Sequence, residues 1–197
     1  SDVYTPISGE VVDINQSSFL LNIISELIFH ARIFNLISIA FLLQTFFLLF
    51  QNLFSQDNLP NFSVKLLNNQ SSNLVSLTNE ISLISFWATW CLPCIKEIDK
   101  INTFVKDYDN LSVILINTDK AGEIAKVKRF VKTKRYPLDN NYHIIMDYNQ
   151  KLSRSFNAQP IPLTLITKNN QIIFRKRGFN VGDEIEIKNI IEQEIVE

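Results

Sequence analysis

The stretch Phe86–Cys94, which reads Phe-Trp-Ala-Thr-Trp-Cys-Leu-Pro-Cys, decides how the rest of the chain is interpreted. It holds Cys91 and Cys94, the only two cysteines of the sequence, three positions apart. The apolar run Ile81–Trp87 predicts a buried central strand before them, and a helical pattern starts near Leu92. A dithiol is therefore expected at a strand-to-helix turn. There the free N–H groups of the helix favour the thiolate of Cys91.

Two cysteines at this spacing occur in zinc sites, in structural disulfides and in redox centres. Zinc takes four ligands, or three and a water, and no second cysteine pair is present. A disulfide across so short a loop would remove little entropy from the unfolded chain. Attachment of a c-type haem needs histidine where Ile95 stands. The pair therefore favours thiol–disulfide exchange, in which Cys91 attacks and Cys94 resolves the mixed disulfide, with no metal or cofactor.

The segment resembles the active-site segment of the thioredoxin superfamily, and specifically of the TlpA-like, membrane-anchored disulfide reductases that include the cytochrome c maturation thioredoxins. A second element agrees: Gln159–Thr164 reads Gln-Pro-Ile-Pro-Leu-Thr, and Pro162 matches the cis-proline that faces the dithiol in this family. The resemblance covers about Leu59 to Val196. It implies a thioredoxin-like α/β domain over 61–197, with a mixed central sheet and an added N-terminal β-hairpin.

Further site residues follow from the resemblance and from chemistry. Glu97, three residues after Cys94 on the same helix face, matches a family glutamate associated with tuning the thiols. It is expected to exchange a proton with the resolving thiol, although a solvated first-turn carboxylate is the alternative. A cis bond before Pro162 is expected to turn the backbone groups of Ile161 toward an extended substrate. The substrate would then pair with them as an added β-strand does.

The residues around the sulfurs indicate the redox poise and the substrate surface. Trp90, Leu92 and Pro93 are assigned to substrate binding, with Trp90 on an apolar rim. Leu92 and Pro93 add no positive charge, so we expect a Cys91 pKa of about 7 or higher and a potential nearer about −270 mV than about −120 mV. Bare thioredoxins carry a buried aspartate where Ser85 stands, which leaves proton handling to Glu97 or water.

The remaining domain alternates strands and helices. A first hairpin is expected from Asn61–Leu67 and Leu74–Leu77, around the turn 68–73. The other predicted elements are helices or helical turns at 92–108, 121–135, 147–156 and 183–196, and strands at 111–116, 143–146, 163–167 and 171–176. The basic residues of 126–135 and 175–177 are interpreted as solvated surface.

The N-terminal part has a different composition. A polar tail covers 1–18, and the apolar segment 19–54 contains the uncharged run 33–50, which as a helix is about 27 Å long. We expect an uncleaved transmembrane anchor over 19–54, followed by a linker at 55–60. Arg32 precedes the uncharged run 33–50 and the first lysine after that run is Lys65, which favours a catalytic domain on the exported, extracytoplasmic side.

Composition completes the functional prediction. The net charge of −1 argues against a general nucleic-acid binder. The sequence predicts a membrane-tethered reductase of exported protein disulfides, supplied with electrons by a membrane dithiol donor. By resemblance, its substrate is apocytochrome c or an oxidase assembly factor. Two alternatives stay open: a net disulfide oxidase or isomerase, and a non-catalytic tethered module that binds partners through the cis-proline groove.

Overall fold

The computed structural model describes residues 21–30, 32, 38–39, 41–45, 57–139 and 141–196. The chain divides into two compact units, Ser1–Ser55 and Gln56–Glu197. In the first unit the stretches 21–30 and 41–45 are helical. The predicted tail 1–18 and half of the predicted anchor 19–54 lie outside the described residues. Within the parts that are described, no helix combines the length and the apolar character needed to span a bilayer.

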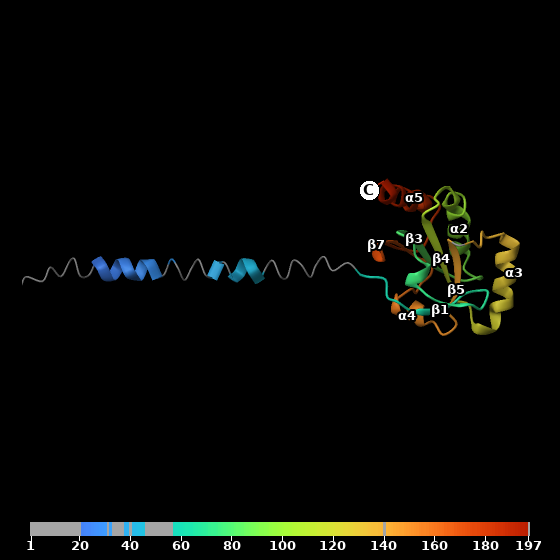
Figure 1. Cartoon of the computed structure of the whole chain (residues 1–197), viewed down its shortest axis with the longest axis horizontal. Coiled ribbons are helices and arrows are strands. Elements are labelled where there is room, and N and C mark those ends of the chain that lie inside the picture. The colour runs from blue at the N-terminus through green and yellow to red at the C-terminus, as the bar shows by residue number, and fades with distance from the viewer. Residues whose placement is uncertain are drawn as a thin grey trace, which may run out of the picture. The chain divides into compact units, whose positions relative to one another are not determined.

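A five-stranded mixed sheet forms the centre of the second unit (Figure 1). Its strand order is β5-β4-β3-β6-β7, with β3, β4 and β5 parallel and β6 antiparallel to both of its neighbours. Every residue of β3 and β4 is buried. Their near-continuous apolar sequences are typical of parallel strands that are covered on both faces. The bounds are β3 Ile81–Trp87, β4 Leu111–Asn117, β5 Tyr142–Met146, β6 Leu163–Lys168 and β7 Gln171–Arg177. The predicted thioredoxin-like mixed sheet is confirmed.

Helices cover both faces of this sheet. One core cluster holds the buried side chains of α2, α3 and α5, and a second holds those of α4 and the segment around the N-terminal hairpin. The helices are α2 Leu92–Ile101, α3 Ile124–Lys134, α4 Lys151–Ser155 and α5 Asp183–Val196, with short 3-10 turns η1 Val75–Leu77, η2 Val105–Asp107 and η3 Ala121–Glu123. The dithiol segment lies at the junction of β3 and α2, where the central strand meets the first layer of helices.

The N-terminal hairpin exists, but its second arm was wrongly placed by the sequence pattern. β1 (Ser63–Lys65) pairs with β2 (Ser71–Asn73), which the prediction had assigned to the turn. Asn69, at a φ of 71°, closes a tight turn in which the Leu66 N–H donates to Gln70 O at 2.9 Å. The polar arm forms because backbone pairing needs no apolar side chains. Leu74 instead is fully buried in the second core cluster.

The predicted helix 92–108 is also too long. The α-helix ends at Ile101, and the Thr103 hydroxyl donates to Lys100 O at 2.6 Å, taking a carbonyl that a continuing helix would use. A 3-10 turn follows at Val105–Asp107. Phe104 and Val105 are still buried. The apolar spacing therefore predicted the buried residues correctly, but not the end of the α-helix.

Candidate functional site

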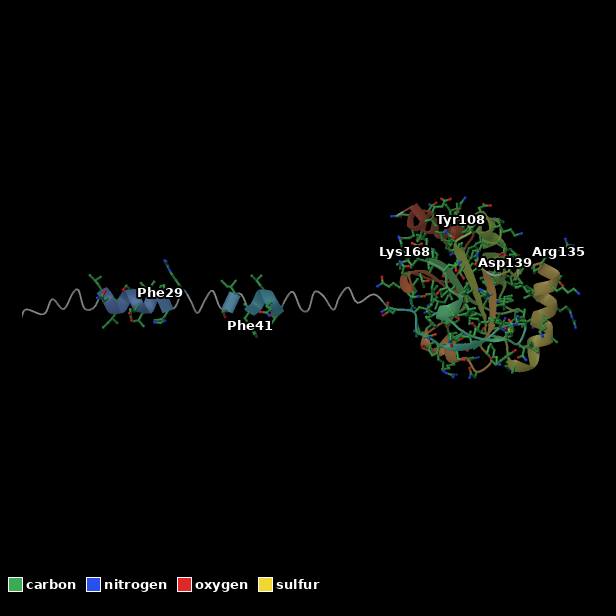
Figure 2. The ribbon with its side chains drawn as sticks, in the orientation of Figure 1. Phe29, Phe41, Tyr108, Arg135, Asp139 and Lys168 are labelled. Carbon is green, nitrogen blue, oxygen red and sulfur yellow. A yellow bond between two sulfur atoms is a disulfide. The ribbon has the colours of Figure 1, made fainter. Side chains whose placement is uncertain are left out.

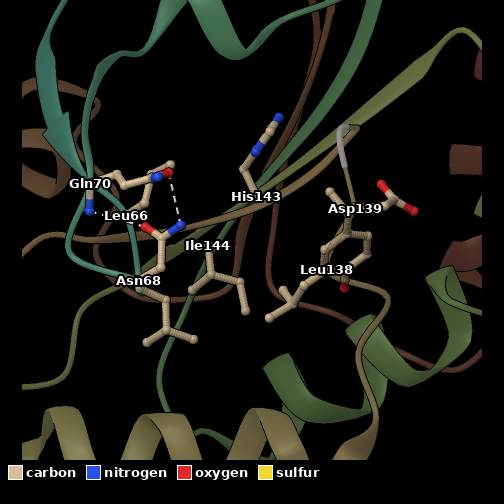
Figure 3. A pocket seen from close by; sticks show the side chains of 9 residues that line it. Leu66, Asn68, Gln70, Leu138, Asp139, His143 and Ile144 are labelled. Atoms are coloured by element: carbon tan, nitrogen blue, oxygen red, sulfur yellow. Dashed lines mark hydrogen bonds between the residues drawn. The ribbon is translucent and has the colours of Figure 1, made fainter.

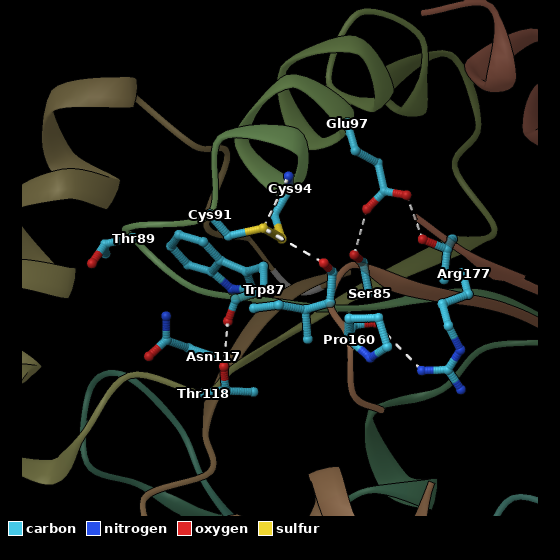
Figure 4. Close-up of a disulfide and its surroundings, with 12 residues drawn as sticks. Ser85, Trp87, Thr89, Cys91, Cys94, Glu97, Asn117, Thr118, Pro160 and Arg177 are labelled. Carbon is cyan, nitrogen blue, oxygen red and sulfur yellow. Dashed lines mark hydrogen bonds between the residues drawn. A yellow bond between two sulfur atoms is a disulfide. The ribbon is translucent and has the colours of Figure 1, made fainter. Parts of the chain in front are cut away.

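The two cysteines occupy the N-terminus of α2. Cys91 is the N-cap residue, and the Cys94 N–H donates to Cys91 Sγ at 3.3 Å. The two sulfurs are joined in a disulfide (Figure 4). Cys91 is 5% exposed and Cys94 is fully buried. Cys91 is therefore the less deeply buried of the two cysteines, at the helix tip where the sequence predicted the attacking sulfur.

The proline-led strand meets the dithiol. The Ile161–Pro162 peptide is cis, and the Ile161 carbonyl oxygen lies 3.9 Å from Cys91 Sγ. Both the cis bond and its place beside the sulfurs match the sequence prediction. Gln159–Pro160 is cis as well, which the sequence did not predict.

Glu97 is buried behind the dithiol and is not a solvated carboxylate. Ser85 Oγ donates to Glu97 Oε2 at 2.7 Å, and Thr164 Oγ1 donates to Oε1 (Figure 4). Ser85 and Thr164 are direct partners across β3 and β6, so one carboxyl group is held by a cross-strand pair of hydroxyls. Removal from water raises the pKa of Glu97 to about 7, and the two hydrogen bonds offset this only in part. A carboxyl group with this pKa can both release and accept a proton near neutral pH.

A second buried carboxylate, Asp119, was not foreseen. It accepts hydrogen bonds from the Thr89 N–H at 2.8 Å, from Thr89 Oγ1 at 3.0 Å and from Asn117 Nδ2 at 2.8 Å. These bonds tie the loop before Cys91 to the end of β4. One signal was available: Asp119 follows a strand parallel to β3, and the carboxyl ends of neighbouring parallel strands share one edge of the sheet.

Arg177 supports the cis-proline segment, although the sequence pattern assigned it to a solvated hairpin edge. Its Nη1 donates to Gln159 O at 2.5 Å, and its Nη2 donates to Asn157 O at 2.7 Å. Nη1 also lies 3.4 Å from Pro160 O (Figure 4). The guanidinium is exposed, yet its fork holds backbone carbonyls directly before Pro162. We therefore interpret Arg177 as a positioning residue for the surface that meets the substrate.

Replacing Arg177 with methionine is expected to lower kcat/KM for a protein disulfide by about tenfold, because small misplacements of a binding segment cost one to two orders of magnitude. Reaction with a small aromatic disulfide should be unchanged, since it does not pair with this segment. Stopped-flow assays with both substrates test the split. Arg175→Met is the matched control: Arg175 holds Phe156 O, further from Pro162. An equal loss on both substrates would contradict the positioning role.

The surface around the sulfurs is apolar. Trp90 is 61% exposed and Leu92 is 70% exposed, and Pro93 is exposed between the cysteines. Ile161 is half-buried. Trp87, in contrast, is fully buried in the core. Among the described residues no group of three or more His, Cys, Asp or Glu side chains is placed to hold a metal ion. The geometry suits thiol–disulfide exchange with a protein segment laid across the apolar rim.

Comparison with known proteins agrees with this chemistry. Residues 55–178 match the model of the AhpC/TSA family. The chain is 31% identical over 116 residues to a thioredoxin-like protein, YneN, of Bacillus subtilis; the match covers 58% of this chain and 65% of that protein, just under two thirds. It is 28% identical over 128 residues to the thiol-disulfide oxidoreductase ResA of Bacillus cereus, covering 64% of this chain and 72% of that protein.

Solved structures show the same fold. A putative thiol:disulfide interchange protein DsbE from Chlorobium tepidum superposes with a TM-score of 0.59 at 20% identity, covering 72% of this chain and 94% of that one. A putative protein disulfide isomerase from Bacteroides thetaiotaomicron gives a TM-score of 0.61 at 21% identity, with coverages of 72% and 90%. At this level of identity the likeness concerns the fold.

Proposed function

We propose that this chain, which belongs to the AhpC/TSA family and is a thioredoxin-like thiol–disulfide oxidoreductase, is a reductase of protein disulfides. The observation that carries the proposal is the meeting of Cys91 at the tip of α2 with the Ile161 carbonyl beside it. The two residues between the sulfurs, Leu92 and Pro93, bring no positive charge to Cys91, so its thiolate is stabilised less than in strongly oxidising dithiols.

The reaction is a two-electron exchange. In the reduced protein the Cys91 thiolate attacks one sulfur of the substrate disulfide, which breaks that bond and releases the other substrate sulfur as a thiolate. Cys94 then attacks Cys91, and the second substrate thiol leaves. The substrate has gained two electrons, and the protein carries the Cys91–Cys94 disulfide. An external dithiol must donate two electrons to start the next cycle.

Glu97 handles the proton of the second step in this proposal. It lies three residues after Cys94 on α2, and its carboxyl group is held between Ser85 and Thr164. As a carboxylate it accepts the proton that Cys94 must lose before it attacks, and as an acid it returns the proton when the disulfide is reduced again.

The cellular setting belongs to the same proposal. The apolar segment 19–54 supports a membrane tether, and Arg32, before the uncharged run 33–50, supports a domain on the exported side. A bilayer anchor, a membrane dithiol donor and exported protein substrates follow from that placement. The resemblance to TlpA-like reductases favours cytochrome c maturation or a related assembly step.

The reduction potential of the Cys91–Cys94 pair tests the direction of electron flow. Equilibration with glutathione or dithiothreitol buffers, followed by alkylation of the free thiols, should give a value near about −270 mV. A value above about −150 mV would identify a net oxidase or isomerase and contradict the proposal. Cys91→Ser, which cannot form the disulfide, provides the baseline for the alkylation signal.

A further inference from the structure

A groove beside α3, here called the α3 groove, is not used by the dithiol chemistry. It has a volume of about 470 Å³, and its apolar lining comes from Leu67, Val131, Tyr136 and Leu138. Leu138 is 55% exposed, although large apolar side chains gain free energy when they leave water. Leu67, Val131 and Tyr136 are 8%, 3% and 7% exposed and form the floor of the groove. Leu138 is therefore the apolar side chain that offers most of the contact to another molecule.

The groove is bordered by positive charge. Lys128, Lys132 and Arg135 line it, and all three are exposed. Two other cations of the same helix, Lys126 and Lys134, are paired with Glu123 and Asp99. No carboxylate in the described part of the chain pairs with the three groove cations. Their charge is therefore available to a ligand that brings carboxylates.

A second pocket continues the α3 groove. It has a volume of about 360 Å³ and shares Leu67, Asn68 and Leu138 with it. Its other end is polar, with Gln70, Asp139 and His143 along the wall, so the positive charge lies only on the α3 side of the two pockets. The Asn68 side chain donates a hydrogen bond to Gln70 there (Figure 3). The two pockets adjoin one another at these shared residues, and together they are called the depression. Two adjoining pockets suit an extended segment better than a single side chain.

This depression lies away from the dithiol. Tyr142, which lines the second pocket, begins β5, whereas Met146 ends it and aligns with Asn117 and then Trp87, close to the cysteines. The four-residue step along β5 from Tyr142 to Met146 separates the second pocket from the level of the cysteines by about 13 Å. Arg135, at the C-terminal end of α3, lies well out on the side of the domain (Figure 2). A molecule held in the groove leaves the Cys91 sulfur free.

We propose that the α3 groove docks an acidic peptide segment of a partner protein, anchored by one or two large apolar side chains. The apolar lining takes the anchors, and Lys128, Lys132 and Arg135 take flanking carboxylates. A flat anionic bilayer fits less well, because the apolar surface is recessed between α3 and the 66–70 turn. This second contact gives the reductase a way to hold a partner while the dithiol reacts elsewhere on it.

Selection from a cysteine-free library of twelve-residue peptides on the full chain in detergent micelles tests the proposal. We expect enriched peptides that combine Glu or Asp with Leu or Phe. In 150 mM salt, K128E/K132E/R135E should weaken binding of a labelled consensus peptide at least tenfold by fluorescence anisotropy, since three charge contacts become repulsive. L138S should weaken it at least fivefold, since the apolar anchor loses its contact.

The matched control is K106E/K126E/R129E, which reverses three exposed charges outside the groove and should change affinity less than threefold. Enrichment without acidic bias, equal binding to the groove variant and the parent, or indifference to L138S would overturn the proposal. Preferential binding of phosphatidylglycerol vesicles over the peptide would also overturn it. Insulin reduction should be unchanged in K128E/K132E/R135E. If the parent chain itself fails to reduce insulin, the proposed function fails while the docking result still stands.

Discussion

Replacing Cys91 with serine is expected to reduce the turnover of protein disulfides to the uncatalysed background, because no other sulfur of the site can be reached from outside. Cys94 is fully buried, whereas Cys91 lies at the helix tip beside the Ile161 carbonyl. Replacing Cys94 with serine has a different result. The first attack still occurs, and the mixed disulfide on Cys91 accumulates because nothing resolves it.

Insulin reduction measures the first effect, and non-reducing electrophoresis with mass spectrometry measures the second. The double variant Cys91→Ser/Cys94→Ser is the control and should give neither turnover nor a mixed disulfide. Equal trapping by the two single variants would show that the sulfurs are equivalent, contrary to the asymmetry of their burial.

Replacing Glu97 with glutamine is expected to slow the release of reduced substrate by about 10²-fold above pH 7, the scale of a lost general base. The pKa of Glu97, raised to about 7 by burial, makes the parent rate rise as pH increases through 7. Glutamine keeps the shape and can still bond to Ser85 and Thr164, but it cannot take a proton. Single-turnover release between pH 5 and 9 should therefore lose this pH dependence in the variant.

Stability provides an independent measurement of the same group. Because the folded-state pKa of about 7 exceeds the ordinary value of 4.5, the folded protein binds more protons than the unfolded chain between these values. The associated stability is fully present below pH 4.5 and is lost as the pH rises through 7. The loss amounts to about 3 kcal/mol of unfolding free energy. The Glu97→Gln variant should not show this loss.

Asp99→Asn is the matched control for both measurements. Asp99 lies on the same helix, but it is exposed and paired with Lys134. Denaturant unfolding at pH 5 and pH 8 should show most of the pH-dependent loss in this control and in the parent chain. If Glu97→Gln keeps the same pH dependence as the parent, another group is responsible.

The parts of this site that the sequence predicted are those that short-range patterns specify. The apolar run Ile81–Trp87 forms a central strand, because a strand that is buried on both faces needs a nearly continuous apolar sequence. The spacing of Cys91 and Cys94 places both at one helix tip, and Pro162 could be matched to a family motif. Glu97 was correctly placed on the Cys94 face of the helix. Its burial was not predictable, because that depends on how closely α2 packs against the sheet.

The missed features depend on contacts between distant segments. Asp119 is thirty positions from Thr89, and Arg177 reaches carbonyls seventeen to twenty positions earlier. Side-chain periodicity reports which face of an element is buried, but not which polar group meets a particular carbonyl. The second hairpin arm was misplaced for a related reason, since backbone pairing formed β2 from the polar residues Ser71–Asn73.

Substrate capture by Cys94→Ser in intact cells, followed by mass-spectrometric identification of the joined peptides, is the most direct measurement of the central claim. The account predicts Cys91 linked to a cysteine of an exported protein, and no such link in the Cys91→Ser chain. Capture of cytosolic proteins alone would contradict the proposed location. Peptides joined through any residue other than Cys91, or no joined peptide at all, would contradict the mechanism.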